Sequence, residues 1–476
     1  MQLQRPFDPV VTFRNSQGEA ARGTLTSLQR RSLVMEIYNP YSIVQVSEVL
    51  NELTIRSGER SIYKGKAVVV SLLNTGLMAV VSVALIDEWS DLNVFPGISP
   101  RVGEEAQRFV SGWAERFQIN RDYQVCVSEV RAYLSEVSRW TDQADLSDAL
   151  PRGKDGRVST QAFTELAEPL MAAAAQYFSD FEGAIDKVPV DLAATYRSFA
   201  QGSLHPLLLR APFVFRTFAK PLGYAGDYEM VNQILSDPQQ GPTTYFQMVN
   251  ALFLRSAVAE AHRNRIDILV EWLKKAAGRA AELGRPVRIL NIGCGPAVEI
   301  RRLLSSEVDF SQLEFTLVDF SEHTLQDTRA KMAQEAARAG KTLKVDWVNE
   351  SVHDLLKRAS RRAATEGSSD LFDFVYCAGL FDYLSDKVCA RLLDYFKSRT
   401  RPNGEVLVTN VHPSNPQRGV MEHVLEWYLI YRDEAQLRAV LPSNTSNLRV
   451  FTDKTGVNVF AEFTVMVHEP VTELAM

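Results

Sequence analysis

The sequence predicts a multidomain protein with a small N-terminal β-barrel, a helical middle region and a C-terminal doubly wound α/β sheet that ends in an antiparallel hairpin. Three observations support this fold class. Short β-rich apolar runs fill residues 1–97, the apolar period becomes helical over residues 98–205, and strands alternate with helices over residues 206–476. A chain of 476 residues is also too long for one ordinary core.

The predicted barrel consists of short strands separated by Gly, Asn, Pro and Ser. Its strand candidates are VVTF, GTLTSL, SLVMEIY, IVQVSEVL and LTI. The stretch Ala67–Ile86 has the length of a membrane span. However, Asn74-Thr75-Gly76 lies at its centre between β-branched runs, which is a hairpin signal. We therefore expect a buried hairpin and a soluble protein without stable membrane insertion.

The composition excludes several classes of function. A net charge of -6 argues against a nucleic-acid partner, because phosphate binding needs an excess of basic residues. The four cysteines have neither metal-ligand spacing nor the density of a disulfide framework, so we expect no metal site. They are Cys126, Cys294, Cys377 and Cys389. Together with an N-terminus unlike a secretory signal, they predict a cytoplasmic protein.

The middle region carries apolar stripes at helical spacing. Its helix candidates are VGEEAQRFVSGWAERF, YQVCVSEVRAYLSEVSRW and QAFTELAEPLMAAAAQYFSDFEGAI. In the C-terminal region, buried-strand candidates alternate with helical patterns, as in a parallel sheet covered by helices. They are VRILNIG, FTLVDF, LKVDWVN, FDFVYCAG and GEVLVTNV. The segment LRVFTDKTGVNVFAEFTVMV then predicts two strands joined at Lys454-Thr455-Gly456.

A glycine loop follows the first of these C-terminal strands. It runs from Asn291 through Gly293, Cys294 and Gly295 to Ala297, where a helix begins. Glycines at these positions permit a tight turn and the close approach of a cofactor to the backbone. The sequence therefore predicts a cofactor-binding strand–turn–helix unit.

Asp319 ends the second of these strands, 24 residues after Gly295. This is close to the spacing at which an acidic residue reaches a ribose diol, and its carboxylate can accept hydrogen bonds from both hydroxyls. The alternative is a surface aspartate at the end of a strand. Phe320 follows it at the same edge of the sheet.

Two further strand ends are expected to complete the pocket, because ligands of such sheets bind outside the carboxyl ends of the strands. The first is Asn349-Glu350-Ser351, where an amide or a carboxylate would bind the adenine amine. The second is Cys377-Ala378-Gly379, whose small residues leave room for the reacting centre. Cys294 and Cys377 are interpreted as packing residues.

These motifs, in the order VRILNIGCGPAVEI, LVDFS, FDFVYCAGLFDYL and RPNGEVLVTN, resemble a class I S-adenosylmethionine-dependent methyltransferase over Pro286–Val467. The resemblance implies a Rossmann-like sheet, S-adenosyl-L-methionine as cofactor and S-adenosyl-L-homocysteine as product. Asn291 departs from the family, which usually has Asp or Glu there, and this bears on the contact to the methionine amino group. A dehydrogenase fits less well, because the loop has two glycines and the sheet closes with a hairpin.

The segment Lys220–Glu229, with FQMVNALFLRSAVAEAHRNRIDIL behind it, resembles the bacterial 3-hydroxy fatty acid (3-hydroxypalmitate) methyl ester synthases from Pro206 to the end. This resemblance implies O-methylation of a small-molecule, acyl carboxylate in a quorum-sensing pathway. Asp227 is either part of the cofactor pocket or a helix cap. Candidates to hold the acceptor by hydrogen bonds are Tyr224, His412, Tyr383 and Arg255.

Other assignments of the acceptor and of the barrel stay open. The Asn/Asp-Pro-Pro-aromatic motif of nucleic-acid amine methyltransferases is absent after the fourth strand of the sheet. A small-molecule N-methyltransferase and a regulatory protein with a non-catalytic methyltransferase-like domain are the alternatives. Val420–Tyr431 forms either an acyl-chain wall or ordinary core.

The N-terminal region resembles a degenerate PilZ-like barrel. It has Arg30-Arg31 but lacks the Arg-x-x-x-Arg run and the polar turn of that family, which argues against cyclic di-GMP as a ligand. We expect the barrel to be a docking, regulatory or dimerising module, the last of which would make the protein a homodimer.

Overall fold

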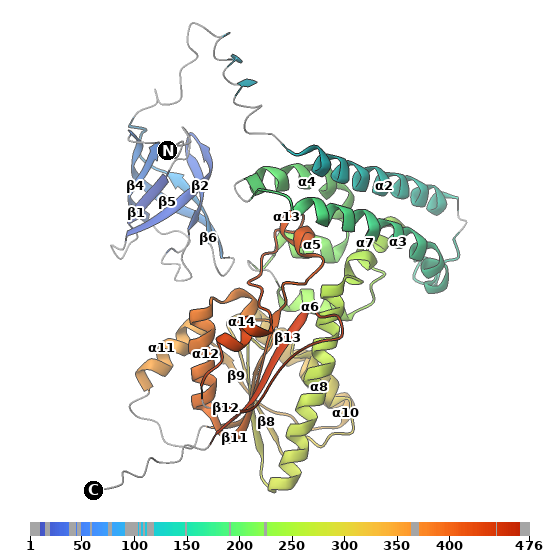
Figure 1. Ribbon diagram of the computed structural model, residues 1–476, viewed down its shortest axis with the longest axis vertical. Coiled ribbons are helices and arrows are strands. Elements are labelled where there is room, and N and C mark those ends of the chain that lie inside the picture. Colours follow the sequence, from blue (N-terminus) through green and yellow to red (C-terminus); the bar gives the residue numbers. More distant parts are fainter. Residues whose placement is uncertain are drawn as a thin grey trace. The chain divides into compact units, whose positions relative to one another are not determined.

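The structure is a computed structural model (Figure 1). It describes residues 10–14, 20–37, 44, 49–57, 60–74, 79–90, 103, 106–107, 110–111, 119–147, 150–189, 192–222, 226–362, 371–443 and 445–466. The chain divides into two compact units. The first contains the barrel, and the second comprises residues 121–219 and 226–476.

The first unit is a closed six-stranded barrel with strand order β1-β2-β3-β6-β5-β4. The strands are β1 (Val10–Arg14), β2 (Ala20–Gln29), β3 (Ser32–Ile37), β4 (Val49–Ser57), β5 (Arg60–Asn74) and β6 (Ala79–Leu85). Side chains alternate along β6 between the core and a half-buried face, as the period of a strand requires. β5 and β6 pair antiparallel, so the hairpin predicted within residues 67–86 is confirmed.

The second unit begins with helices. They are α2 (Arg121–Leu146), α3 (Thr160–Ile185), α4 (Ala193–Leu208), α5 (Pro212–Ala219), α6 (Tyr228–Leu235), α7 (Thr244–Leu254) and α8 (Ala257–Leu283). Ser159 starts α3 by accepting a hydrogen bond from the Ala162 N–H, and Asp227 starts α6 in the same way. The helices predicted within residues 123–140 and 161–185 are confirmed.

A seven-stranded mixed sheet follows, with strand order β12-β13-β11-β10-β7-β8-β9. The strands are β7 (Val287–Ile292), β8 (Leu313–Asp319), β9 (Lys344–Asn349), β10 (Phe372–Cys377), β11 (Thr400–Val411), β12 (Thr445–Thr452) and β13 (Asn458–Val465). β7 to β11 pair in parallel, whereas β13 lies antiparallel to both β11 and β12. All five predicted parallel strands and the terminal hairpin are therefore confirmed.

Helices cover both faces of this sheet (Figure 1). One hydrophobic cluster joins β7 and β8 to α8, α9 (Val298–Leu304) and α10 (Glu322–Ala339). A second cluster joins β10, β11 and β13 to α11 (Val352–Arg362), α12 (Asp386–Arg399) and α14 (Glu434–Ala439). Strands buried on both faces are apolar at nearly every position, which explains the continuous apolar runs of β7 and β10.

Three expectations differ from the structure or lie outside it. The boundary expected between residues 205 and 206 lies inside α4, because the helix continues through Pro206. Most of residues 102–117, a helix candidate, lies outside the described residues, as does most of residues 43–48, part of a strand candidate. In the part of the chain that the structure describes, no helix is both long and apolar enough to span a bilayer.

Phe374 offers a test of the sheet core. Its side chain is 0 % exposed on β10 and packs edge-on against Trp272 of α8. We expect Phe374→Ala to lower the free energy of unfolding by about 3–5 kcal/mol, because the truncation leaves a cavity. The matched control is Phe215→Ala, since Phe215 is 53 % exposed on α5. Equal shifts of the urea unfolding midpoint in the two variants would contradict this core.

Candidate active site

The carboxyl ends of the parallel strands bring the predicted cofactor residues to one edge of the sheet. The glycine loop follows β7, Asp319 ends β8, Asn349 ends β9 and Cys377 ends β10. β7 lies between β8 and β10 in the sheet, so the loop is central and the other strand ends flank it. This is the edge at which ligands of such sheets bind.

The glycine loop has backbone angles that favour glycine. Gly293 and Gly295 have φ of 69° and 50°, in the left-handed region. A Cβ on Gly293 would also lie 3.3 Å from the Leu380 side chain. Ala297 adopts φ 43° without glycine's freedom, which is a strained position at the start of α9.

Asp319 holds this loop in place. One carboxylate oxygen accepts a hydrogen bond from the Gly295 N–H at 3.0 Å, and the other accepts one from the Ser321 N–H at 3.0 Å. Burial raises the pKa of this carboxyl, and the backbone N–H donors lower it. The Phe320 N–H is a third backbone donor to this carboxylate, which has about four acceptor positions, so acceptor capacity remains for a ribose hydroxyl.

At the end of β9, the three predicted residues have structural partners. The Asn349 amide donates to the backbone oxygens of Asp319 and Phe320. Glu350 forms an ion pair with Arg358 at 2.7 Å, and Ser351 accepts a hydrogen bond from the Asp354 N–H, close to the start of α11. Phe320, by contrast, is 56 % exposed beside Asp319. These contacts fix the shape of this side of the site.

A buried polar cluster lies beneath the glycine loop, centred on Glu299 of α9. The same Glu299 oxygen accepts a hydrogen bond from the Tyr376 hydroxyl at 2.7 Å and one from the Asn291 amide at 3.3 Å. Burial raises the pKa of Glu299, whereas the Tyr376 hydroxyl, the residue's own backbone N–H and nearby Arg265 lower it. Sequence reasoning included Asn291 but missed Glu299, Tyr376 and Arg265. For Glu299 and Arg265, the available signal in the sequence was a charged residue within an otherwise amphipathic helix.

Two atoms of this cluster have no hydrogen-bond partner among the described residues. They are Nη1 of Arg265, on α8, and Oδ1 of Asn291. Arg265 is 7 % exposed and Asn291 is 2 % exposed. Arg265 occupies the space where Gly379 lacks a side chain, since a Cβ there would lie 2.8 Å from Nη1. Buried polar atoms without partners are costly, so this arrangement indicates a ligand that supplies them.

The methionine part of S-adenosylmethionine fits these two atoms. Its carboxylate is the acceptor that the Arg265 guanidinium requires, and its ammonium group is the donor that the Asn291 oxygen requires. Asn291 stands where the family usually has Asp or Glu, and its side-chain oxygen is still a hydrogen-bond acceptor at that position.

Tyr383 and Asp382 lie in the short helix η4 (Phe381–Tyr383), after β10. The Tyr383 hydroxyl accepts a hydrogen bond from Nε1–H of Trp427 at 2.9 Å. Asp382 accepts one from the Val411 N–H at 2.7 Å, and burial raises its pKa to about 6. The Tyr383 phenol accepts one hydrogen bond and keeps its own hydrogen. It can therefore donate a hydrogen bond to the molecule that accepts the methyl group.

Gly226 and Tyr228 contact residues that follow two of the parallel strands. Gly226, at φ 76°, lies so close to the Tyr383 hydroxyl that a Cβ there would collide with it. The Tyr228 hydroxyl lies 3.2 Å from Nδ1 of His323, on α10. Gly226 therefore lies beside the short helix that follows β10, and the Tyr228 side chain reaches the helix that follows β8.

The remaining predicted residues have contacts of other kinds. Asp227 caps α6 and pairs with Arg216 at 2.8 Å, as the helix-cap interpretation requires. His412 accepts a hydrogen bond from the Ser414 N–H and lies 3.2 Å from Glu434. Arg255 ends α7 and pairs with Glu168 of α3. Both residues lie in the run of helices α2 to α7 and their caps, which we call the helical segment. Tyr224 lies outside the described residues.

The cysteines of the site are buried packing residues. Cys294 and Cys377 are 6 % and 0 % exposed, and burial raises the pKa of both thiols above the usual value. A thiol that stays protonated is a weak nucleophile. Ala378, next to Cys377, packs against the cluster on the α8 face.

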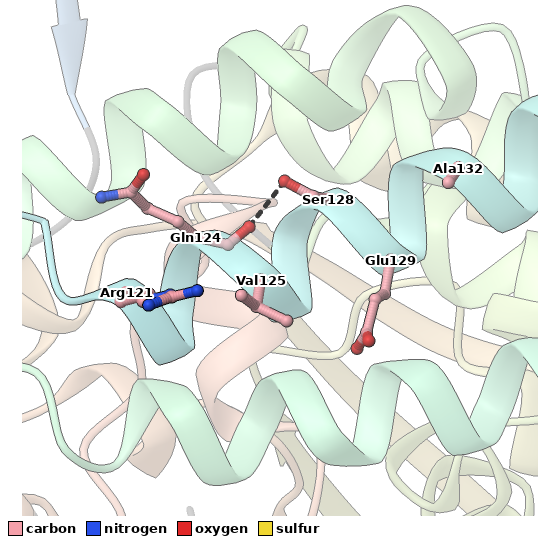
Figure 2. Close-up of a pocket in the computed structure, with 6 residues that line it drawn as sticks. All are labelled: Arg121, Gln124, Val125, Ser128, Glu129 and Ala132. Carbon is pink, nitrogen blue, oxygen red and sulfur yellow. Dashed lines mark hydrogen bonds between the residues drawn. The ribbon is translucent and has the colours of Figure 1, made fainter.

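A surface hollow on α2 is separate from this site. Figure 2 shows its six lining residues, all from that one helix, with a hydrogen bond from the Ser128 hydroxyl to the Gln124 backbone oxygen. The hollow contains none of the predicted site residues.

Residues 290–406 match the family model of the methyltransferase domain. This segment includes the glycine loop, Asp319 and the ends of β9 and β10. Residues 290–406 therefore carry a methyltransferase domain. No curated protein sequence matches the chain.

Three solved structures are similar at low identity. A possible exported protein from Bordetella parapertussis is 15% identical, with 63% of this chain and 97% of that chain covered and a TM-score of 0.40. Magnesium protoporphyrin IX methyltransferase from Synechocystis, with bound SAH, is 15% identical, with 53% of this chain and 97% of that chain covered and a TM-score of 0.35. The N-methyltransferase NodS from Bradyrhizobium japonicum is 13% identical, with 50% of this chain and 97% of that chain covered and a TM-score of 0.31.

The contact between Asn291 and Glu299 predicts the effect of restoring an acid at this position. Asn291→Asp places a second carboxyl beside a buried carboxyl, so one of them stays protonated in the folded protein. Because the folded state then binds a proton that the unfolded state releases above about pH 4, stability falls as pH rises.

We therefore expect Asn291→Asp to be destabilised relative to the native protein, increasingly so from pH 5 to pH 8. Thermal unfolding across this range measures the difference. Asn232→Asp, at a half-buried position on α6 near Glu229, is the control. A variant as stable as the native protein at pH 8 would contradict the Asn291–Glu299 contact.

Proposed function

We propose that this protein uses its methyltransferase domain to convert the carboxylate of a small molecule, such as a 3-hydroxy fatty acid, to its methyl ester. The main support for the cofactor site is the pair of buried, unpartnered atoms on Arg265 and Asn291 beside the glycine loop. Asp319, whose carboxylate keeps acceptor capacity beyond its backbone donors, supports the ribose contact. The carboxylate acceptor is supported by the resemblance of residues 206–476 to fatty acid methyl ester synthases.

When bound, S-adenosylmethionine supplies an electrophilic methyl group on a positively charged sulfur. An acceptor carboxylate is ionised at neutral pH, so it needs no general base. The acceptor oxygen would take the methyl group that the cofactor, held by Arg265, Asn291 and Asp319, would supply. The protein's task is then to align the acceptor and exclude water. Tyr383 donates a hydrogen bond to the acceptor, and Gly226 together with Tyr228 covers the site.

One observation favours an amine acceptor as the second candidate. Asp382 is buried next to Tyr383, and its pKa of about 6 suits a general base, which an ammonium acceptor requires. The two candidates yield different products, since a methyl ester is cleaved by mild alkali and a methylamine is not. A regulatory protein without turnover predicts cofactor binding and neither product.

The barrel is proposed to be a docking, regulatory or dimerising module. Its interior is filled by hydrophobic side chains, among them Phe13, Met35, Leu53 and Val81, which leaves the outer surface for partners. The four cysteines are unpaired, and three of them are buried, which supports a reducing, cytoplasmic location.

The first test is calorimetric titration with S-adenosylmethionine and S-adenosylhomocysteine. We expect one saturable site, weakened at least about tenfold by Asp319→Ala, because a tenfold change corresponds to the loss of roughly one hydrogen bond to a charged group. Asp309→Ala is the matched control, since Asp309 accepts its hydrogen bonds from Ser311, before the start of β8 and away from the strand ends of the site. If the native protein bound neither compound, the cofactor site would be wrong.

A further inference from the structure

The chain between β11 and α14 connects the helical segment to the site. It contains α13 (Arg418–His423) and the residues up to Arg432. We name residues 418–428 the insert. Its α13 helix contacts α3 and α4, and its Trp427 contacts Tyr383.

The helical segment holds the first half of the insert through its backbone. The carboxylate of Glu182, on α3, accepts hydrogen bonds from the N–H groups of Gly419 and Val420, both at 2.7 Å. Burial raises the pKa of Glu182 to about 7, against the lowering effect of these two donors. Gly419 must lack a side chain, because a Cβ would collide with Glu182 and lie 2.9 Å from Ile185.

Three further side chains of the helical segment bind His423 and Val424. The Tyr123 hydroxyl lies 2.9 Å from Nδ1 of His423, and Gln201 donates to the His423 backbone oxygen. His205, on α4, donates from Nε2 to the Val424 backbone oxygen at 2.8 Å. Burial lowers the pKa of His423 to about 4, so its ring is neutral at pH 7.

The second half of the insert reaches η4. Trp427 is 3 % exposed and donates its indole N–H to the Tyr383 hydroxyl. Just beyond the insert, the Ile430 N–H donates to the Asp382 backbone oxygen at 2.7 Å. The indole contact fixes the direction of the phenol oxygen, and therefore the direction in which its own hydrogen points.

We propose that Trp427 and Glu182 are positioning residues for the acceptor: Glu182 anchors the insert, and the insert orients Tyr383 through Trp427. The helical segment thus supports the acceptor side of the site, while the cofactor side depends on β7, β8, α8 and α9. This inference rests on the proposed function for the role of Tyr383. It predicts that damage to the Glu182 contact reaches Tyr383 and leaves the cofactor contacts unchanged.

The test uses the full-length protein and three variants. Glu182→Gln leaves one acceptor oxygen for two N–H donors, and Trp427→Phe removes only the indole N–H while keeping an aromatic ring. Glu165→Gln is the matched control, since Glu165 is exposed on the same helix and accepts from Gln161. The first readout is amide hydrogen exchange of three segments: residues 418–424, 380–386 and 290–297.

We expect Glu182→Gln to speed exchange in residues 418–424 and 380–386, and Trp427→Phe to do so only in residues 380–386. Residues 290–297 keep their protection in both variants, and the S-adenosylhomocysteine Kd stays within about twofold. If Glu182→Gln loosened residues 418–424 without changing 380–386, the proposed coupling would be overturned. Unfolding of the variants would show as lost protection in all three segments, in which case Gly419→Ala, which strains the same contact, replaces Glu182→Gln.

The second readout is kinetic, with 3-hydroxypalmitate as acceptor. Both variants are expected to raise the KM of the acceptor about fivefold, the factor that corresponds to one net hydrogen bond, with the KM of S-adenosylmethionine unchanged. Equal increases in both KM values would point to a general structural defect and overturn the positioning role. Absence of turnover by the native protein would refute the proposed acceptor, and the exchange measurement would still decide the coupling.

Discussion

The buried carboxyl of Glu299 is the interaction on which the site depends. It joins β7 through Asn291, β10 through Tyr376 and α8 through the charge of Arg265. A carboxyl removed from water is stable only where donors and a positive charge surround it. These three elements must therefore keep their relative positions, and the glycine loop between them keeps its shape.

The two sides of the site differ in how they are supported. On the cofactor side, the contacts come from strand ends and short loops, such as Asp319 with the Gly295 N–H. On the acceptor side, Tyr383 is held by a segment that is itself bound by distant helices. The two sides of the proposed site therefore depend on different parts of the chain.

Prediction from sequence succeeded where local patterns carry the information. The parallel strands were visible as apolar runs, and the glycine loop and Asp319 followed from their spacing along the chain. The residues that need long-range contacts were missed. Arg265 and Glu299 look like ordinary charges on amphipathic helices, whereas His412, at a strand end, proved to contact its own loop and Glu434.

The sequence by itself determined the barrel, the sheet and the place of the cofactor loop, because strand period, glycine positions and spacing are local properties of the chain. Only the tertiary structure decided which polar atoms are buried without partners and which helix anchors which loop. Glu182 and Gly419 are 237 residues apart, and no pattern along the chain relates them. Their contact exists because α3 and α13 pack together, and packing is a property of the whole domain.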